Sequence, residues 1–464
     1  MKGFLRFMAQ PVSASSKSGE LQGIPRSMQR LLKSFYPEMG SAMSEALLRH
    51  LVLVMLSPVF GFAQTEKLPR WQKGFMDIHH ISTGRGNATF MVFPDGTTML
   101  FDAGEISDTH PRTRSTRNSS PRPDSTRPAH EWVARYILEF SPPGRSSIDY
   151  GVVSHFHDDH FGEWDEGRKR SLKGDYVLTG IVGVGDAVPI GRIFDRGHSD
   201  PVDLKSPGFR ERFARDEYHI VQTLGNYFSF LNSQVMQGRS YDTVVVGAND
   251  QFRLLYDTAG FPEWRVMNIA GAGRVATGFA NRESVRVVRK GEYPGENPLS
   301  VCLKISYGRF DYFTGGDIAG IDDLGGADFH SMESQVAPVV GPVDVATLNH
   351  HGNRDSQQPY YVRALRPRVW IQQTWSSDHP GHDVLRRIMS QSIYPGERDL
   401  FSTDLLVPNI DVIGEPAIAR AYKSRNGHVV VRVAPRGDRY SVFVLDDRDK
   451  DYRVVSQHGP YLSR

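Results

Sequence analysis

The sequence predicts an α/β fold with a cluster of histidines and aspartates at the end of a strand, and three observations indicate this. Short apolar runs with strand-forming residues recur along the chain, and stretches with helical spacing of apolar residues lie between them. The 44 glycines and 28 prolines indicate many turns, as in a strand-rich chain. The run Ser154-His155-Phe156-His157-Asp158-Asp159-His160 follows one of the apolar runs directly.

The composition limits the classes of protein that the chain can represent. The formal net charge is +2 over 464 residues, so the overall charge does not require a polyanionic partner. Hydrophobic residues make up 39% of the chain, which is enough for a large buried core. The single cysteine, Cys302, excludes an internal disulfide and a cysteine-based metal site. It lies in an apolar run, so we expect a buried thiol on a strand.

Residues 1–69 are predicted to be a leader and a linker. A basic residue, Arg49, precedes the apolar segment Leu51–Phe62, and small residues follow up to Ala63, which is the layout of a signal peptide. The apolar segment is too short for a permanent membrane-spanning helix. We therefore expect export to a bacterial periplasm or cell surface, with Met43 as the more natural start. The alternative is an amphipathic or buried N-terminal helix on a cytoplasmic protein.

The first elements after the leader are three predicted strands. The runs from Phe75 to Ile81 and from Ala88 to Phe93 have strand patterns. The turn Pro94-Asp95-Gly96-Thr97 leads into a third strand at Thr98, because Asp-Gly between apolar runs is a strong hairpin signal. This strand ends at Asp102-Ala103-Gly104.

The segment from Thr109 to Pro128 is rich in Arg, Ser, Thr and Pro and contains almost no apolar residue, which predicts a mobile surface loop. Basic residues in it could bind phosphate, although this composition more often marks a solvated loop. They are Arg112, Arg114, Arg117, Arg122 and Arg127. A helix follows, with Trp132, Tyr136, Ile137 and Phe140 on one face, and then a strand from Tyr150 to Val153.

Residues 165–295 contain no sharp motif and are interpreted as an insertion in a domain that covers 70–464. Within them, Phe209–Leu231 predicts a polar helix and Tyr241–Val246 a short strand. Regular structure resumes after the insertion. The predicted elements are strands at Leu299–Tyr307, Phe310–Thr314, Val343–Leu348 and Val369–Gln373, a helix at Gly381–Ser390, and a hairpin of His428–Val433 with Tyr440–Leu445.

The His/Asp run has the spacing of metal ligands. An extended His-x-His places the imidazoles of His155 and His157 on one side of the chain. The turn that follows can bring Asp159 and His160 close to them. Imidazole and carboxylate suit zinc, manganese or iron, and two clusters of such ligands suit a pair of ions. The alternative is a solvated His-rich loop, which the preceding apolar strand disfavours.

The run resembles the H-x-H-x-D-H signature of the metallo-β-lactamase superfamily, and other motifs stand in that family's order. Asp102 resembles the early aspartate beneath the site, and Asp317 in Phe313-Thr314-Gly315-Gly316-Asp317 resembles the aspartate that bridges two metals. Asn349-His350-His351-Gly352 resembles the loop of the final metal histidine. The resemblance implies a four-layer αββα sandwich, with two mixed sheets face to face, helices outside, and the site at a sheet edge.

Further motifs are similar to the hydrolase domain of the ComEC-type DNA-uptake proteins. These are Ile81 to Thr89, Glu296-Asn297-Pro298-Leu299-Ser300, His350-His351-Gly352 and Asp378-His379-Pro380. By analogy they imply a phosphodiester substrate, with nucleic acid as one possibility. The chain has no apolar run of spanning length after the leader, so it lacks that family's transmembrane channel.

The resemblance also assigns roles to residues. The implied metal ligands are His155, His157, Asp159, His160, Asp317 and one of His350 and His351. We favour His350, which would follow the strand directly, with His351 behind it. Asp159 would also orient the attacking hydroxide, and His379 would hydrogen-bond the substrate or protonate the leaving group. The alternative for His379 is a structural histidine at a helix start.

Two departures from the family pattern stand out. The family commonly supplies a third histidine to the first metal, but the interval contains only His198 and His219, and we expect both at the surface. Asn87 stands where the DNA-uptake branch usually has an acidic residue.

We expect a hydrolase with two divalent ions, zinc or else manganese or iron, that uses a metal-bound hydroxide on a phosphodiester. A second hypothesis is a hydrolase of a lactone, lactam or thioester, and a third is a binding protein with a vestigial site. Basic groups around the mouth of the site would favour the phosphodiester. A narrower apolar pocket would favour ring opening.

Overall fold

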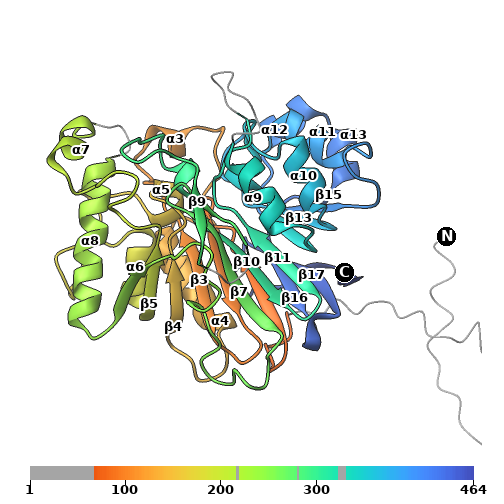
Figure 1. The fold of residues 1–464 in the computed structure, drawn as a ribbon, viewed down its shortest axis with the longest axis horizontal. Coiled ribbons are helices and arrows are strands. Elements are labelled where there is room, and N and C mark those ends of the chain that lie inside the picture. Colours follow the sequence, from red (N-terminus) through yellow and green to blue (C-terminus); the bar gives the residue numbers. More distant parts are fainter. Residues whose placement is uncertain (1–66, 216–218, 279–281, 322–330) are drawn as a thin grey trace, which may run out of the picture. The chain divides into compact units, whose positions relative to one another are not determined.

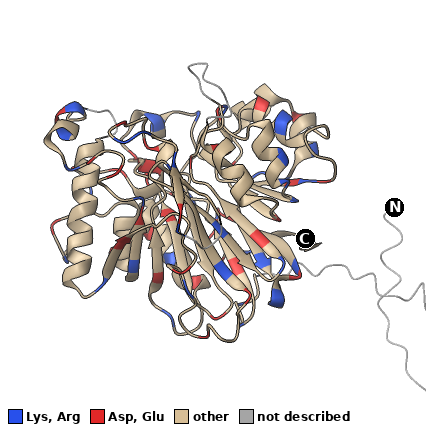
Figure 2. Cartoon of the chain, viewed as in Figure 1, with Lys and Arg blue, Asp and Glu red and all other residues tan. Residues whose placement is uncertain are grey.

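The computed structural model describes residues 67–215, 219–278, 282–321 and 331–464. The predicted signal peptide lies outside the described residues. Among the helices that the structure describes, none is both long and apolar enough to cross a membrane. Figure 2 shows acidic and basic residues interspersed over the helices and loops, in line with the nearly neutral net charge of +2.

Within the described residues, nine strands form the first sheet. In spatial order they are β18 (Val454–Leu462), β17 (Arg439–Leu445), β16 (His428–Val433), β1 (Met76–His80), β2 (Ala88–Val92), β3 (Thr98–Ala103), β4 (Ile148–Val152), β5 (Ile190–Asp195) and β6 (Ser240–Thr243). Strands β3 to β6 are parallel to one another, and the remaining pairs are antiparallel. The sheet is therefore mixed, as predicted.

The second sheet also has nine strands in the described ranges. In order they are β15 (Tyr422–Ser424), β14 (Asp399–Ser402), β13 (Val369–Gln372), β12 (Val345–Thr347), β11 (Phe310–Thr314), β10 (Cys302–Tyr307), β7 (Trp264–Gly271), β8 (Arg274–Ala276) and β9 (Ser284–Arg286). Strands β11 to β15 are parallel, and β10, β7, β8 and β9 are antiparallel. Parallel strands of both sheets thus end in loops that can build a site.

Helices cover the outer face of each sheet (Figure 1). The first sheet is covered by α4 (Ala129–Phe140), α6 (Gly180–Ala187) and α8 (Ile220–Met236), which share one buried apolar cluster with its strands. The second is covered by α9 (Met332–Val340), α10 (Pro359–Leu365), α11 (His382–Met389) and α13 (Glu415–Ala421), which share another. A third cluster contains residues of both sheets and lies between them. The predicted four-layer αββα sandwich is confirmed.

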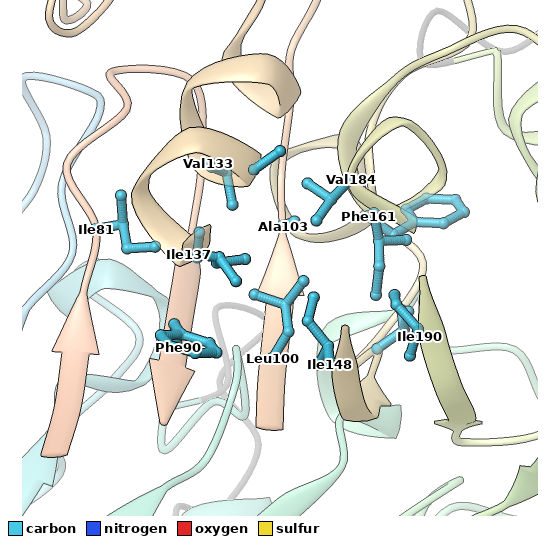
Figure 3. Close-up of a cluster of buried hydrophobic side chains, with 14 of the residues drawn as sticks. Ile81, Phe90, Leu100, Ala103, Val133, Ile137, Ile148, Phe161, Val184 and Ile190 are labelled. Atoms are coloured by element: carbon cyan, nitrogen blue, oxygen red, sulfur yellow. The ribbon is translucent and has the colours of Figure 1, made fainter. Parts of the chain in front are cut away.

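Helical spacing in α4 explains how the outer layer is attached. Val133 and Ile137 stand four residues apart and point toward Phe90 of β2 and Leu100 of β3 (Figure 3). Burial of an apolar side chain of this size contributes about 1.5–3 kcal/mol. Strand alternation explains the inner layer, because Val429, Val431 and Val433 of β16 all belong to the cluster between the sheets.

Most of the predicted strands are confirmed within one or two residues, and β11 and β16 match their predicted ranges. Cys302 is buried on β10, as expected, and burial raises the pKa of its thiol. The helix predicted at Phe209–Leu231 is instead two helices, α7 (Pro207–Arg212) and α8. Residues 165–295, which we interpreted as an insertion, supply β5 and β6 to the first sheet and β7, β8 and β9 to the second.

Candidate metal centre

Loops from both sheets bring the candidate ligands together. His155 and His157 follow β4, and Asp159 and His160 lie in the single-turn helix α5 (Asp158–Phe161). Asp317 follows β11 of the other sheet. His351 lies in the 3-10 turn η3 (Asn349–Gly352), which follows β12. The site therefore lies where loops after parallel strands of the two sheets converge.

Four buried residues form the first candidate site, which we name the Asp159 group: Asp159, His160, Asp317 and His351. Their ligand atoms lie within 4.8 Å of one another. His160 Nε2 is 3.1 Å from Asp317 Oδ1, and His351 Nε2 is 3.3 Å from Asp317 Oδ2. His351 Nε2 also lies 3.0 Å from Asp159 Oδ2. Two imidazoles and two carboxylates thus face a common point.

The second candidate site, the His155 group, consists of His155, His157 and Asp317, whose ligand atoms also lie within 4.8 Å of one another. His155 Nε2 is 3.2 Å from His157 Nδ1 and 3.8 Å from Asp317 Oδ2. Asp317 belongs to both groups, so it takes the bridging place that the resemblance implied. The two groups together suit a pair of ions.

Neighbouring hydrogen bonds fix which imidazole nitrogens are free to bind a cation. His351 Nδ1 donates to the carbonyl of Gln373 at 3.1 Å, and His160 Nδ1 donates to Asp102 Oδ2 at 2.9 Å. Nε2 is therefore the nitrogen of each ring that faces the carboxylates of the Asp159 group, and the one that a cation would bind after displacing its proton. Histidine ligands of metals are commonly oriented by such a second hydrogen bond. Asp102 lies beneath the site, as expected.

The pKa shifts show that the Asp159 group attracts positive charge. Burial acts to lower the pKa of His160, but the carboxylates of Asp317 and Asp159 outweigh it and raise this pKa well above its usual value. The same balance raises the pKa of His351 to about 10. Burial acts to raise the pKa of Asp317, and His160 and His351 hold it well below its usual range. Such a ligand set fits a divalent cation, which would take the place of these protons.

His155 differs from these two histidines. Burial lowers its pKa well below the usual value, and His160 lowers it further. The ring is therefore neutral at neutral pH, which is the form of histidine that binds metal.

The two histidines of η3 have different roles from those that we favoured. His350 Nδ1 donates to Asp355 Oδ1 at 2.8 Å, and its Nε2 accepts from Asn297 Nδ2 at 3.2 Å. Neither described group includes His350, whereas His351 belongs to the Asp159 group. The geometry therefore favours His351 over His350, the residue that we preferred, as the candidate ligand. Both residues have left-handed backbone angles, with φ of 47° and 55°, and this turn directs the second histidine into the site.

His379 lies against the ligands, and a tryptophan that sequence reasoning missed lies beside it. The His379 ring stacks on that of His351, with centroids 4.6 Å apart and planes at 15°. Trp375 packs edge-on against His379, and its Nε1 donates to Asp159 Oδ2 at 2.8 Å. Trp375 therefore orients a candidate ligand. Its place shortly before Asp378-His379-Pro380 was the one sequence signal that could have identified it.

The residues that mark departures from the family pattern lie outside both groups. His198 is half-buried and packs against Phe228 at 5.3 Å, and His219 is exposed beside Trp164 at 6.3 Å. We expected both at the surface, which holds fully for His219 only. Asn87 supports the site through its backbone, because its N–H donates to the Asp159 carbonyl at 2.8 Å.

A cavity of about 500 Å³ opens over the two groups. Residues of both groups form one side of it, together with His350 and His379. Polar residues from elsewhere form the rest, namely Arg112, Ser115, Arg117, Asn118, Asp158, Asn353, Trp375, Ser376 and Asp378. Two arginines thus lie at the cavity that contains the candidate ligands.

These arginines come from the segment that we predicted to be a mobile surface loop. It includes the short helix α3 (Pro111–Arg114), and Asn118 forms an isolated bridge with Ser376. Arg112 pairs with Asp158, and Arg122 pairs with two carboxylates that are distant in sequence. The segment is therefore fixed against the rest of the site. Composition could not show this, because the partners come from other parts of the chain.

No family model and no curated protein matches the chain. It is similar to a mutant of CmlA β-hydroxylase, with 11% identity and a TM-score of 0.33 over 89% of this chain, and spans 60% of that protein. It is also similar to Zn²⁺-bound PqqB from Methylobacterium extorquens, with 8% identity and a TM-score of 0.33 over 77% of this chain and 99% of that one. A protein of unknown function from Enterococcus faecalis has 8% identity and a TM-score of 0.28, with 76% of each chain covered.

These similarities are too low to carry an argument about activity. The fold is established by the two mixed sheets, the helices outside them and the apolar core between them. The chain has a four-layer αββα fold, with a buried His/Asp cluster suited to metal where loops of the two sheets meet.

Proposed function

We propose that the protein is a binuclear metallohydrolase that cleaves phosphodiesters. One observation carries the proposal. Two ligand groups share Asp317 in a cavity of about 500 Å³ that Arg112 and Arg117 also line. The ligand set supports the hydrolase, and the arginines support the choice of substrate.

The protein holds the ligands in place before any ion binds. Asp102, Gln373 and Trp375 each hydrogen-bond to a ligand of the Asp159 group, so the donor atoms need little rearrangement. Two divalent ions bound there would activate water for attack and stabilise negative charge on the substrate. Asp159 and Asp317 would contribute the negative charge that keeps these ions close together.

The mouth of the cavity supports an anionic substrate. Arg117 is exposed, and no carboxylate pairs with it among the described residues, so its guanidinium is available to phosphate oxygens. Arg112 shares its charge with Asp158 and lies over the Trp375 ring at 5.5 Å. Basic groups at the mouth favour a phosphodiester over a lactone, lactam or thioester, whose reacting carbonyl carries no charge. His379, which lines the same cavity, would hydrogen-bond the substrate.

The test is metal analysis combined with hydrolysis of bis(p-nitrophenyl) phosphate. We compare the unchanged chain with Asp159→Ala and Asp317→Ala, and with Asp175→Ala as a control in an exposed ion pair. We expect about two ions per chain and turnover that is lost in both site variants but not in the control. Two ions without turnover would refute the phosphodiester and favour a carbonyl substrate. No bound metal after supplementation would refute the enzyme and favour a binding protein with a vestigial site.

A further inference from the structure

A second, smaller cavity of about 170 Å³ lies beside the metal centre. His157 and Asp158 line both this side cavity and the large one. Both cavities therefore border the ligand run, the segment His155–His160 that contains candidate metal ligands. Its other lining residues are mostly aromatic or aliphatic, in contrast to the polar mouth of the large cavity. The side cavity thus offers a different chemical environment at a short distance from the same ligands.

Two pairs of aromatic rings form its walls. Phe156 lies between His155 and His157, Phe161 directly follows His160, and their ring centroids are 5.5 Å apart. Phe213 and Tyr293 form the other pair, with ring centroids 5.3 Å apart and planes at 72°. Ile220, at the start of α8, completes the apolar lining. Phe213, Ile220 and Tyr293 all belong to residues 165–295, so this segment supplies one side of the cavity.

The walls are held by one buried ion pair. Arg196 packs on the Phe156 ring at 4.8 Å and pairs with Glu296, and both side chains are fully buried. The hydroxyl of Tyr293 donates to Glu296 Oε1 at 2.8 Å. Phe156 on one wall and Tyr293 on the other are therefore fixed to the same pair. A cavity with fixed walls loses little entropy when a ligand enters.

We propose that the side cavity binds a planar aromatic group that the substrate carries on its phosphodiester. This inference rests on the proposed function, because it places the phosphate at the two ligand groups. An apolar cavity of about 150 Å³ is sufficient to bind benzene, and the side cavity is of that size. Aromatic walls favour an aromatic occupant through stacked and edge-to-face contacts. His157, a candidate ligand, lines both cavities, so the phosphate and the aromatic group of one substrate would lie on either side of this residue.

The test compares two diesters with the same leaving group, p-nitrophenyl phenyl phosphate and p-nitrophenyl methyl phosphate. Both carry one negative charge, and they differ only in the ester group that remains on the phosphate. We expect kcat/KM to be at least about tenfold higher for the phenyl ester, because burial of an aromatic ring is worth more than one factor of ten. Ile220→Trp, which fills the cavity, and Phe213→Ala, which removes a wall, should both reduce this ratio toward one. Gln222→Trp adds the same bulk at an exposed position two residues along α8 and should leave the ratio unchanged.

Binding of diphenyl phosphate and dimethyl phosphate, measured by calorimetry on the metal-loaded chain, separates this inference from the proposed function. Turnover without a preference for the phenyl ester, or a preference that survives Ile220→Trp and Phe213→Ala, would overturn the inference and leave the phosphodiesterase intact. No turnover, with diphenyl phosphate bound more tightly and Ile220→Trp abolishing the difference, would refute the phosphodiesterase and support the side cavity. No turnover and equal binding of the two probes would overturn both.

Discussion

The buried ion pair of Arg196 and Glu296 should contribute both to the free energy of unfolding of the chain and to its affinity for metal. The two side chains are 0% and 1% exposed and form two hydrogen bonds, at 2.6 and 2.8 Å. Glu296 Oε2 also accepts from the backbone N–H of Phe156 at 3.1 Å, between the two histidines of the His155 group. Burial acts to raise the pKa of Glu296, but Arg196 outweighs it and holds this pKa below its usual value. Glu296→Gln would leave the buried guanidinium without its counter-ion.

The structure allows the cost to be estimated. Removing one partner of a buried ion pair costs roughly 3–5 kcal/mol, a large part of the 5–15 kcal/mol that stabilises an ordinary domain. Replacing both partners with apolar residues, Arg196→Met with Glu296→Met, leaves no uncompensated charge and should recover most of that loss. The double variant still lacks the acceptor for the Phe156 N–H. Its affinity for the ion at the His155 group should therefore stay about 10–100-fold weaker.

Urea unfolding in the presence of a chelator measures the stability without a contribution from metal, and calorimetric titration with Zn²⁺ measures the affinity. Asp175→Asn, which breaks the exposed pair of Arg170 and Asp175, is the matched control and should leave both quantities unchanged. An unchanged urea midpoint for Glu296→Gln would refute the assignment of stability to this pair. Full recovery of Zn²⁺ affinity in the double variant would refute the role of Glu296 in orienting the ligand run.

Three further outcomes are expected. Trp375→Phe keeps an aromatic ring but removes the donor to Asp159, so metal affinity measured by competition with a chelating dye should fall about 10–100-fold. An unchanged affinity would contradict this role for Trp375. Arg117→Ala should raise KM for bis(p-nitrophenyl) phosphate by about tenfold or more with little change in kcat, and Arg117→Lys should recover part of the loss. A loss confined to kcat would contradict ground-state binding by Arg117. Burial lowers the pKa of His428 from 6.5 to about 3, so between these values the unfolded chain takes up a proton that the folded chain does not. The free energy of unfolding should therefore fall by about 2 kcal/mol from this residue between pH 7 and pH 5. His428→Asn, which keeps an acceptor for the Ser82 N–H, should show a correspondingly smaller decrease in urea unfolding; an equal decrease would rule the residue out as the cause.

The sequence pattern predicted strands that are rich in β-branched or aromatic residues, and missed strands that contain a buried polar residue or a proline. The run of β16 has the same bounds in prediction and structure. Strand β7 was missed because it contains Asn268, a polar residue that is buried and bonded to Val245 and Gln251. Sequence alone does not distinguish such a residue from a solvated one. Strand β18 was missed because Pro460 argues against a strand, although an edge strand such as this one tolerates proline.

The residues of the candidate site were likewise predicted only in part. The spacing of the His/Asp run and the motif that ends at Asp317 predicted most of the residues that the structure brings together in the two candidate groups. The choice between His350 and His351 depends on two left-handed backbone angles that the residue types do not specify. Trp375 and Arg196 act through contacts with residues far away in sequence, and a single sequence carries no record of such contacts.

The origin of the ligands in two different sheets has a consequence for the folding of the chain. An ion bound between Asp159 and Asp317 would fasten the loop after β4 to the loop after β11, and so join halves of the protein that pack through apolar contacts. Because only the folded chain presents both loops together, free metal at a thousand times its dissociation constant would add about 4 kcal/mol to the free energy of unfolding. Metal starvation would then weaken the fold and the chemistry at once. The amount of intact protein in a cell would follow the metal supply.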